Sequence, residues 1–75
     1  ERFINIYVRS DDKTAKLIGK KIYEVDLPGE SLVAILERGE SVNIPHGNTE
    51  IREGDKLSII GQTEDIEEIK ELKNK

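Results

Sequence analysis

The sequence predicts a single small domain of the α+β class, and three observations carry that prediction. The chain has 75 residues, which is near the lower limit for one hydrophobic core. Short runs of β-branched and aromatic residues, separated by turn residues, predict a sheet of about four to five short strands. Towards the end of the chain the apolar residues recur with a helical period, which predicts a C-terminal helix.

The first predicted strand covers residues 3–9 and is apolar on both faces. One face carries only aliphatic side chains, at Ile4, Ile6 and Val8. By the two-residue period of a strand, the aromatic side chains of Phe3 and Tyr7 point the other way. We therefore expect one face to meet the core and the second face to meet another surface.

A short helical segment is expected after this strand. Residues 14–18 are interpreted as an irregular lead-in, and residues 19–25 as about two helical turns with their apolar side chains facing inward. Pro28 and Gly29 suit the central positions of a type II turn, because proline fixes φ and glycine accepts a positive value.

The strongest predicted strand covers residues 31–37, and its continuous apolar stretch implies burial on both faces. Residues 41–45 return as the second strand of a hairpin, which ends where Pro45 lacks a backbone donor. A brief extended piece at residues 49–52 follows the loop.

A last strand is expected at residues 56–61, after a turn in which Gly54 takes the left-handed conformation. Thr63 is the expected N-cap of the C-terminal helix. The buried stripe of that helix is expected to consist of Ile66, Ile69 and Leu72.

The composition excludes several classes of protein. Cysteine is absent, which removes disulfides and thiolate metal sites; this suits a reducing cytoplasm but is also common in small secreted domains. A net charge of -4 with mixed signs gives no broad positive field, so a nucleic-acid partner is not expected. The longest apolar run is too short to cross a bilayer. Because so small a core often needs a partner surface, association is the expected source of extra stability.

Three segments in this order and at these spacings resemble a known family. Residues 33–39, 44–45 and 49–61 are similar to the C-terminal domain of regulators of potassium conductance, the RCK_C or TrkA-C domain. Residues 17–20 and 25–28 support the match. The resemblance implies a mostly antiparallel sheet with a short helix and a C-terminal helix, and a domain that usually pairs with a copy of itself.

The same resemblance implies a regulatory and non-catalytic role. Family members commonly follow a nucleotide-binding domain or act with a membrane cation transporter or channel, so we expect a cytoplasmic module, residues 1–75, taken from a longer chain. In one branch of the family, cyclic di-AMP binds between two such domains in an apolar pocket supported by arginine or histidine. No cofactor is required. The alternative is a purely structural dimerisation module without a small-molecule ligand.

The expected ligand site lies at the end of the hairpin and includes basic residues near the turns. Its members are Asn43, Ile44, Pro45, His46, Arg38 and Arg52. An apolar strand end can stack on a base, and the polar groups can bind its edges or a phosphate. The alternative interpretation is that the polar loop residues are merely solvated and that the arginines form surface ion pairs with neighbouring carboxylates.

A second expected surface is a dimer interface formed by Phe3, Tyr7, Val33 and Ile35. The alternative is that the helices of the domain cover these side chains. No metal site is expected, because the spacing of Asp11, Asp12 and Glu24 fits no calcium-binding loop. No catalytic residue is expected either, since His46 is the sole histidine and no nucleophile and base can be paired.

Overall fold

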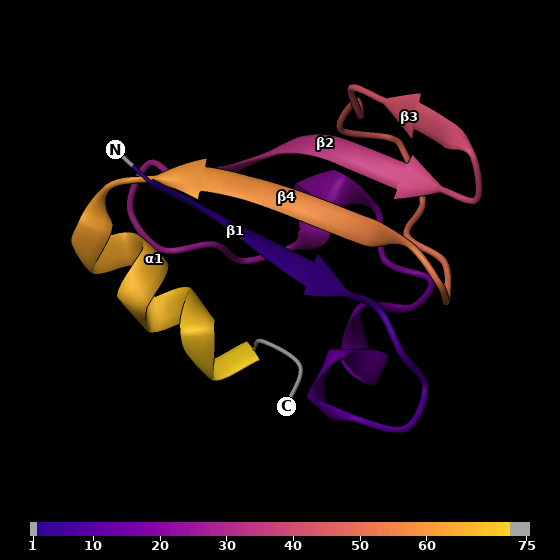
Figure 1. Ribbon diagram of the computed structural model, residues 1–75, viewed down its shortest axis with the longest axis horizontal. Coiled ribbons are helices and arrows are strands. Elements are labelled where there is room, and N and C mark those ends of the chain that lie inside the picture. Colours follow the sequence, from indigo (N-terminus) through magenta and orange to yellow (C-terminus); the bar gives the residue numbers. More distant parts are fainter. Residues whose placement is uncertain (1, 73–75) are drawn as a thin grey trace.

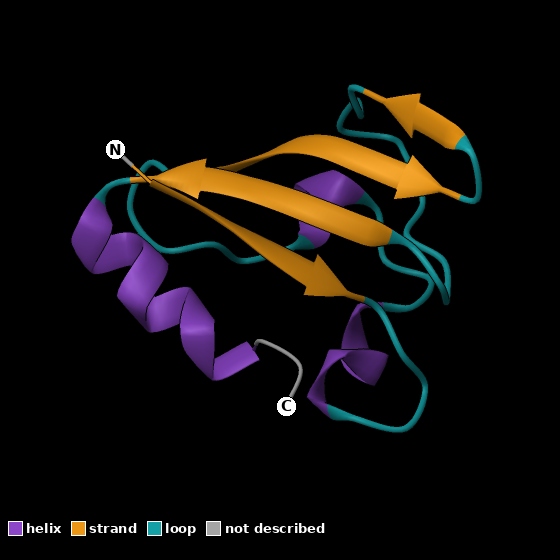
Figure 2. Cartoon of the chain, viewed as in Figure 1, coloured by secondary structure: helices purple, strands orange, loops and turns teal. Residues whose placement is uncertain are grey.

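The sheet has four antiparallel strands, and the computed structural model describes residues 2–72 (Figure 1). The strands lie in the spatial order β1 (Arg2–Tyr7), β4 (Lys56–Gly61), β2 (Leu32–Arg38) and β3 (Ser41–Asn43). Every neighbouring pair is antiparallel. The helical segments pack on one face of this sheet (Figure 2). The α+β fold expected from the sequence is confirmed.

Strand β4 lies in the centre and fixes the register of the sheet. Its first and last residues pair with Tyr7 and Arg2 of β1, so the two strands are aligned along their whole length. The alternation of side chains then places Leu57 and Ile59 on the helix side and Ser58 on the other. Because β4 is flanked on both sides, it is the strand on which the two faces of the sheet are best defined.

A β-bulge interrupts β2 between Val33 and Ile35. Val33 pairs with Ile59, while Ile35, two residues later, pairs with Ser58, the immediate neighbour of Ile59. The extra residue is Ala34. Because a bulge adds one residue to one strand only, it reverses the alternation, and Val33 and Ile35 lie on opposite faces of the sheet.

The segment between β1 and β2 forms two short 3₁₀ helices, η1 (Lys13–Leu17) and η2 (Ile22–Glu24). Of the two helical turns predicted at residues 19–25, only the single 3₁₀ turn η2 forms, and the lead-in expected to be irregular contains η1. The backbone explains the difference: the N–H of Gly19 donates to the carbonyl of Ile51 at 2.8 Å, and the N–H of Ile51 donates to the carbonyl of Lys20 at 2.8 Å. Groups used in this pairing are not available to a continuous helix.

The turns depend on glycines with positive φ. Gly54 has φ 92°, which confirms the left-handed conformation predicted for it. Gly29 has φ 57°, but the N–H of Ser31 donates to the carbonyl of Pro28, so Pro28 is the first residue of the turn and not a central one. The turn thus lies one residue later than predicted.

The C-terminal helix α1 (Thr63–Ile69) continues as a short 3₁₀ turn, η3 (Lys70–Leu72). Gln62 occupies the N-cap position without a side-chain hydrogen bond, so Thr63 is the first helical residue and not the predicted cap. Ile66 and Ile69 are buried as expected. The side chain of Leu72 lies outside the described part of the chain. None of the helices within residues 2–72 is long and apolar enough to cross a bilayer.

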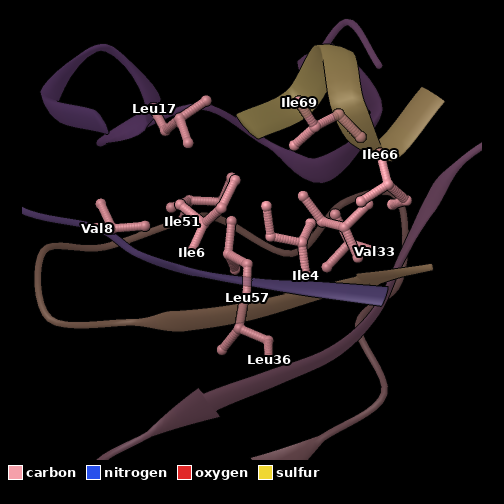
Figure 3. Close-up of a cluster of buried hydrophobic side chains, with 11 residues drawn as sticks. Ile4, Ile6, Val8, Leu17, Val33, Leu36, Ile51, Leu57, Ile66 and Ile69 are labelled. Carbon is pink, nitrogen blue, oxygen red and sulfur yellow. The ribbon is translucent and has the colours of Figure 1, made fainter. Parts of the chain in front are cut away.

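The core lies between the sheet and the layer formed by α1 and η1 (Figure 3). Its side chains are all aliphatic: Ile4, Ile6, Val8, Leu17, Val33, Leu36, Ile51, Leu57, Ile59, Ile66 and Ile69. Ile51 comes from the loop before β4 and is fully buried. The 3₁₀ segments and the loop around Ile51 therefore cover the same face of the sheet as α1.

Candidate functional site

The face of the sheet opposite the helices, which we call the open face, is largely apolar and exposed. Phe3 is 67% exposed, Tyr7 45%, Leu32 52% and Ile35 36%. Ile60 pairs with both Phe3 and Leu32 and links β1 to β2 across β4. A shallow hollow in this face is lined by Phe3, Ala34, Ile35, Ser58, Ile59 and Ile60. Burying such a surface against another one is favourable, because it removes apolar area from water.

Polar side chains on the open face pair with one another. The hydroxyl of Ser58 donates to the side-chain carbonyl of Asn5 at 2.8 Å. The ammonium of Lys56 lies 3.5 Å from a carboxylate oxygen of Glu37 and 5.8 Å from the centre of the Tyr7 ring. These pairs lower the cost of covering the polar part of the face, since their groups keep partners when water is removed.

Three of the four residues expected at a dimer interface lie on the open face, and Val33 does not. Phe3, Tyr7 and Ile35 are all exposed there, whereas Val33 faces the core and is 8% exposed. A regular two-residue period would place Val33 and Ile35 on the same face, but the bulge between them separates them. Leu32 takes the place assigned to Val33. The sequence does not indicate this exchange, because every residue from 32 to 36 is apolar and the position of a bulge cannot be recognised in such a run.

The hairpin end extends this apolar surface towards the candidate ligand residues. Val42 pairs with Glu37, a residue of the open face, and the Val42 side chain is 67% exposed. Ile44, two residues later, is 79% exposed, and Pro45 is half-buried. A large aliphatic side chain exposed to this degree is a ready contact for a flat apolar group.

The loop after β3 is closed by its own hydrogen bonds. The N–H of His46 donates to the hydroxyl of Thr49 at 2.9 Å, and the N–H of Thr49 donates to the carbonyl of His46 at 3.0 Å. The side chains of Asn43 and His46 are both exposed. The loop thus has a defined backbone and presents an amide and an imidazole to solvent beside Ile44.

Tyr23 lies next to this loop, and the sequence interpretation did not select it. Its N–H donates to the carbonyl of Gly47 at 3.0 Å, and its side chain is 65% exposed. The Cα of Gly47 faces the Tyr23 side chain so closely that an added methyl group would touch it at 3.6 Å. An exposed tyrosine in a short helical segment carries no sequence signal of its own, because only the tertiary structure brings residue 23 to residue 47.

The two candidate arginines have different surroundings. Arg38 forms a two-point ion pair with Asp55: its Nε donates to Oδ1 at 2.9 Å and its Nη2 donates to Oδ2 at 2.8 Å. Arg52 is exposed, and its Nε lies 3.8 Å from a Glu50 carboxylate oxygen. Arg38 is therefore committed to a contact within the domain, whereas Arg52 is held by a weak surface pair at most.

Asp55 is completely buried, and its charge is stabilised by specific hydrogen bonds. Burial by itself raises the pKa of Asp55, but the bonds from the Arg38 guanidinium and from the backbone N–H of Arg52 outweigh it and hold the pKa below its ordinary value. The same pair raises the pKa of Arg38. Burial of a turn residue such as Asp55 cannot be inferred from the local sequence pattern.

Asp12 and Glu24, two of the acidic residues considered for a cation site, cap the 3₁₀ helices η1 and η2. One carboxylate oxygen of Asp12 accepts from the N–H and hydroxyl of Thr14, and the carboxylate of Glu24 accepts from the N–H of Lys21. Within residues 2–72, no three acidic or histidine side chains gather in a way that could hold a metal ion.

Comparison with known proteins gives a consistent result. A family model of the TrkA-C domain matches residues 7–74. A Trk system potassium uptake protein TrkA homolog of Archaeoglobus fulgidus is 38% identical over 56 residues, which are 75% of this chain and 13% of that protein. The chain thus spans a small part of the length of this relative.

Three solved structures have the same fold. An RCK domain with cda superposes with a TM-score of 0.77 at 22% identity and covers 99% of this chain and all of its own. The RCK C domain of the potassium transport protein KtrA in complex with cyclic di-AMP superposes with a TM-score of 0.73 at 22% identity. The match covers 92% of this chain and 79% of the KtrA chain. The RCK_C domain dimer of S. agalactiae BusR in complex with cyclic di-AMP superposes with a TM-score of 0.71 at 19% identity. The match covers 96% of this chain and 95% of the BusR chain.

Proposed function

Because the chain belongs to the TrkA-C domain family, we propose that it is a regulatory module of a potassium or other cation transport system. The relative from Archaeoglobus fulgidus, a potassium uptake protein, supports the transport system. The module acts in the cytoplasm and is not an enzyme. Its partners are an attached or associated nucleotide-binding domain and a membrane cation transporter or channel.

Two copies of the module pair through their open faces. The observation that carries this step is the exposure of Phe3, Tyr7, Leu32 and Ile35 on a face that the described helices do not cover. A twofold axis brings the same surface of each copy together, so Lys56 of one copy can meet Glu37 of the other. The dimeric BusR domain supports the pairing, since it has the same fold.

The ligand of the paired module is a cyclic dinucleotide, with cyclic di-AMP as the first candidate. Both KtrA and BusR domains bind cyclic di-AMP, and both have this fold. In this chain the hairpin end supplies apolar surface at Ile44 and Pro45 and polar groups at Asn43 and His46. Arg52 is the exposed cation of the candidate set that is available for a phosphate.

Binding of a ligand between the two copies favours one arrangement of the pair over others. A ligand that contacts both copies binds the pair more tightly than the separate chains, and it stabilises the pair by mass action. The resulting shift in geometry is passed to whatever is attached to each copy. In this way a small molecule regulates a gate without any chemical reaction.

A structural role without a ligand is the second candidate, and one observation favours it. The polar groups of the open face pair with one another, as Asn5 does with Ser58 and Lys56 with Glu37. A face of this kind is suited to packing against a protein surface even where no small molecule is present.

Calorimetric titration of the 75-residue chain separates the two roles. We expect cyclic di-AMP to bind with one molecule per two chains, while AMP, potassium and calcium ions do not reproduce its effect. The variant Ile44→Ser should weaken binding at least about tenfold through lost apolar contact, and Ile18→Ser, at an exposed aliphatic residue next to η1, is the matched control. If no nucleotide or cation shifts the melting temperature of a stable dimer, the structural role is correct and the ligand is excluded.

A further inference from the structure

Arg38 connects three segments of the chain that surround the hairpin loop. It is the last residue of β2, and its backbone pairs with Ser41 at the start of β3. Its Nη2 donates both to Asp55 and, at 2.8 Å, to the backbone carbonyl of Glu50. The other end of the ion pair, Asp55, lies just before β4 and also accepts from the N–H of Arg52 at 2.8 Å.

The loop at residues 44–49 begins and ends at groups that Arg38 holds. Its first end leaves β3, whose short ladder with β2 includes the Arg38 and Ser41 pair. Its second end reaches Glu50, which is fixed by the Arg38 guanidinium and by a bridge to Lys21. Arg38 thus contributes to holding both ends of the loop, one through its backbone and the other through its side chain.

We propose that Arg38 and Asp55 are positioning residues that hold the loop at residues 44–49 in its binding conformation, and that Arg38 does not contact the ligand. The inference rests on the ligand site proposed above. A loop that is held in place before binding loses less conformational freedom when the ligand arrives, and affinity rises accordingly. The two-point geometry of the ion pair is suited to this task, since it fixes orientation as well as distance.

Direct binding of a phosphate by Arg38 is disfavoured by the burial of its partner. The side chain of Asp55 is 0% exposed, and that of Arg38 is 35% exposed. To reach a phosphate through Nε or Nη2, the guanidinium would have to leave a carboxylate that is enclosed by protein, and an unpaired buried charge is strongly unfavourable. Holding the Glu50 carbonyl, by contrast, requires no release of Asp55, because Nη2 donates to both.

The variant Asp55→Asn distinguishes the two roles of Arg38. If Arg38 positions the loop, the affinity for cyclic di-AMP falls about tenfold, the scale of coupling within a hydrogen-bonded network. If Arg38 contacts the phosphate, the same variant releases the guanidinium, and affinity stays equal or rises. A second test compares Arg38→Met with the double variant Arg38→Met/Asp55→Asn. If the two residues act together, the double variant should lose little more affinity for cyclic di-AMP than the single variant does.

Amide hydrogen exchange gives a readout that does not depend on a ligand. In Asp55→Asn we expect faster exchange at residues 46–52 and unchanged exchange at the centre of β1 and β4. The control Ile69→Val removes one buried methyl group from α1 and should lower the melting temperature without selective exchange in the loop and without loss of affinity.

Each result decides the matter. Loop-confined exchange together with weaker binding supports the positioning role. Unchanged or tighter binding by Asp55→Asn, or faster exchange spread evenly over the sheet, overturns it. If the unmodified chain binds no cyclic di-AMP, the ligand proposal fails by itself, and the exchange pattern still shows whether this ion pair holds the loop.

Discussion

The two faces of the sheet are built from the same strands, yet they differ sharply in exposure. On the helix side, Ile4 is 5% exposed and Ile6 is fully buried, while Phe3 beside them on β1 is 67% exposed. Both faces are apolar in composition. The difference arises because α1, η1, η2 and the loop around Ile51 all pack on one side.

This contrast shows that apolar character and burial are separate properties in a small domain. The chain has enough secondary structure to cover one face of a four-stranded sheet. The second face keeps its apolar side chains and pairs its polar ones internally, which suits a surface that another copy covers. If the open face is the pairing surface proposed above, stability and assembly depend on opposite faces, and substitutions on each face should have different effects.

The largest effect is expected for a truncation on the core face compared with its neighbour on the open face. Ile4→Ala should lower the free energy of unfolding by about 2 to 5 kcal/mol, because it leaves a cavity. Phe3→Ala should change the stability of the monomer by less than about 1 kcal/mol. Chemical denaturation at several protein concentrations tests this, since the cost of Phe3→Ala should grow with concentration through its effect on pairing. Equal costs at low concentration would show that the two faces do not differ in this way.

An intermediate effect is expected when a charge is placed on the open face. Ile35→Asp should raise the dissociation constant of the dimer at least about tenfold, because pairing would bury a carboxylate without a partner. Sedimentation velocity measures the change. Glu30→Gln, at an exposed residue in the turn before β2, changes a charge away from this face and serves as the control. A dimer that tolerates Ile35→Asp must use another surface.

The smallest effect is expected for acid titration, which distinguishes a buried carboxylate from an exposed one. The pKa of Asp55 is lowered in the folded chain, so its contribution to stability is complete above its ordinary value of 3.8 and is lost as the pH falls through the folded value. Asp55→Asn should therefore flatten this acid limb of the unfolding curve.

Glu67 provides the comparison within the same experiment. Hydrogen bonds from Lys70 and Arg2 lower the pKa of Glu67, but this carboxylate is exposed. Added salt should weaken the contribution of Glu67 and leave that of Asp55 nearly unchanged, because buried pairs are screened much less. An acid limb in Asp55→Asn that matches the unmodified chain would mean that Asp55 is not charged and paired in solution.

Features that depend on neighbouring residues could be predicted from the sequence, whereas features that depend on distant residues could not. The last strand was predicted at residues 56–61, as observed for β4, and Gly54 was predicted with the correct sign of φ. These features depend on neighbouring residues. The two helical turns predicted at residues 19–25 are reduced to a single 3₁₀ turn at Ile22–Glu24, since the neighbouring backbone pairs with the loop at residues 49–51, about thirty positions away.

The candidate site shows the same division. The exposure of Phe3 and Tyr7 agrees with the alternation of β1, whereas that of Ile35 depends on the bulge in β2. The exchange of Val33 for Leu32 followed from a bulge, and the commitment of Arg38 to Asp55 joins residues that are 17 positions apart. The roles of Asn43, Ile44, Pro45, His46 and Arg52 in ligand binding stay predictions.

The sequence by itself determined the α+β class, the family and the apolar character of both faces of the first strand, because short-range periodicity and ordered motifs carry that information. Only the tertiary structure decided which face of the sheet the helices cover and which of the two candidate arginines, Arg38 or Arg52, has a buried partner. Those outcomes depend on pairings between distant segments, whose geometry is set when the whole chain packs and not by any local run of residues.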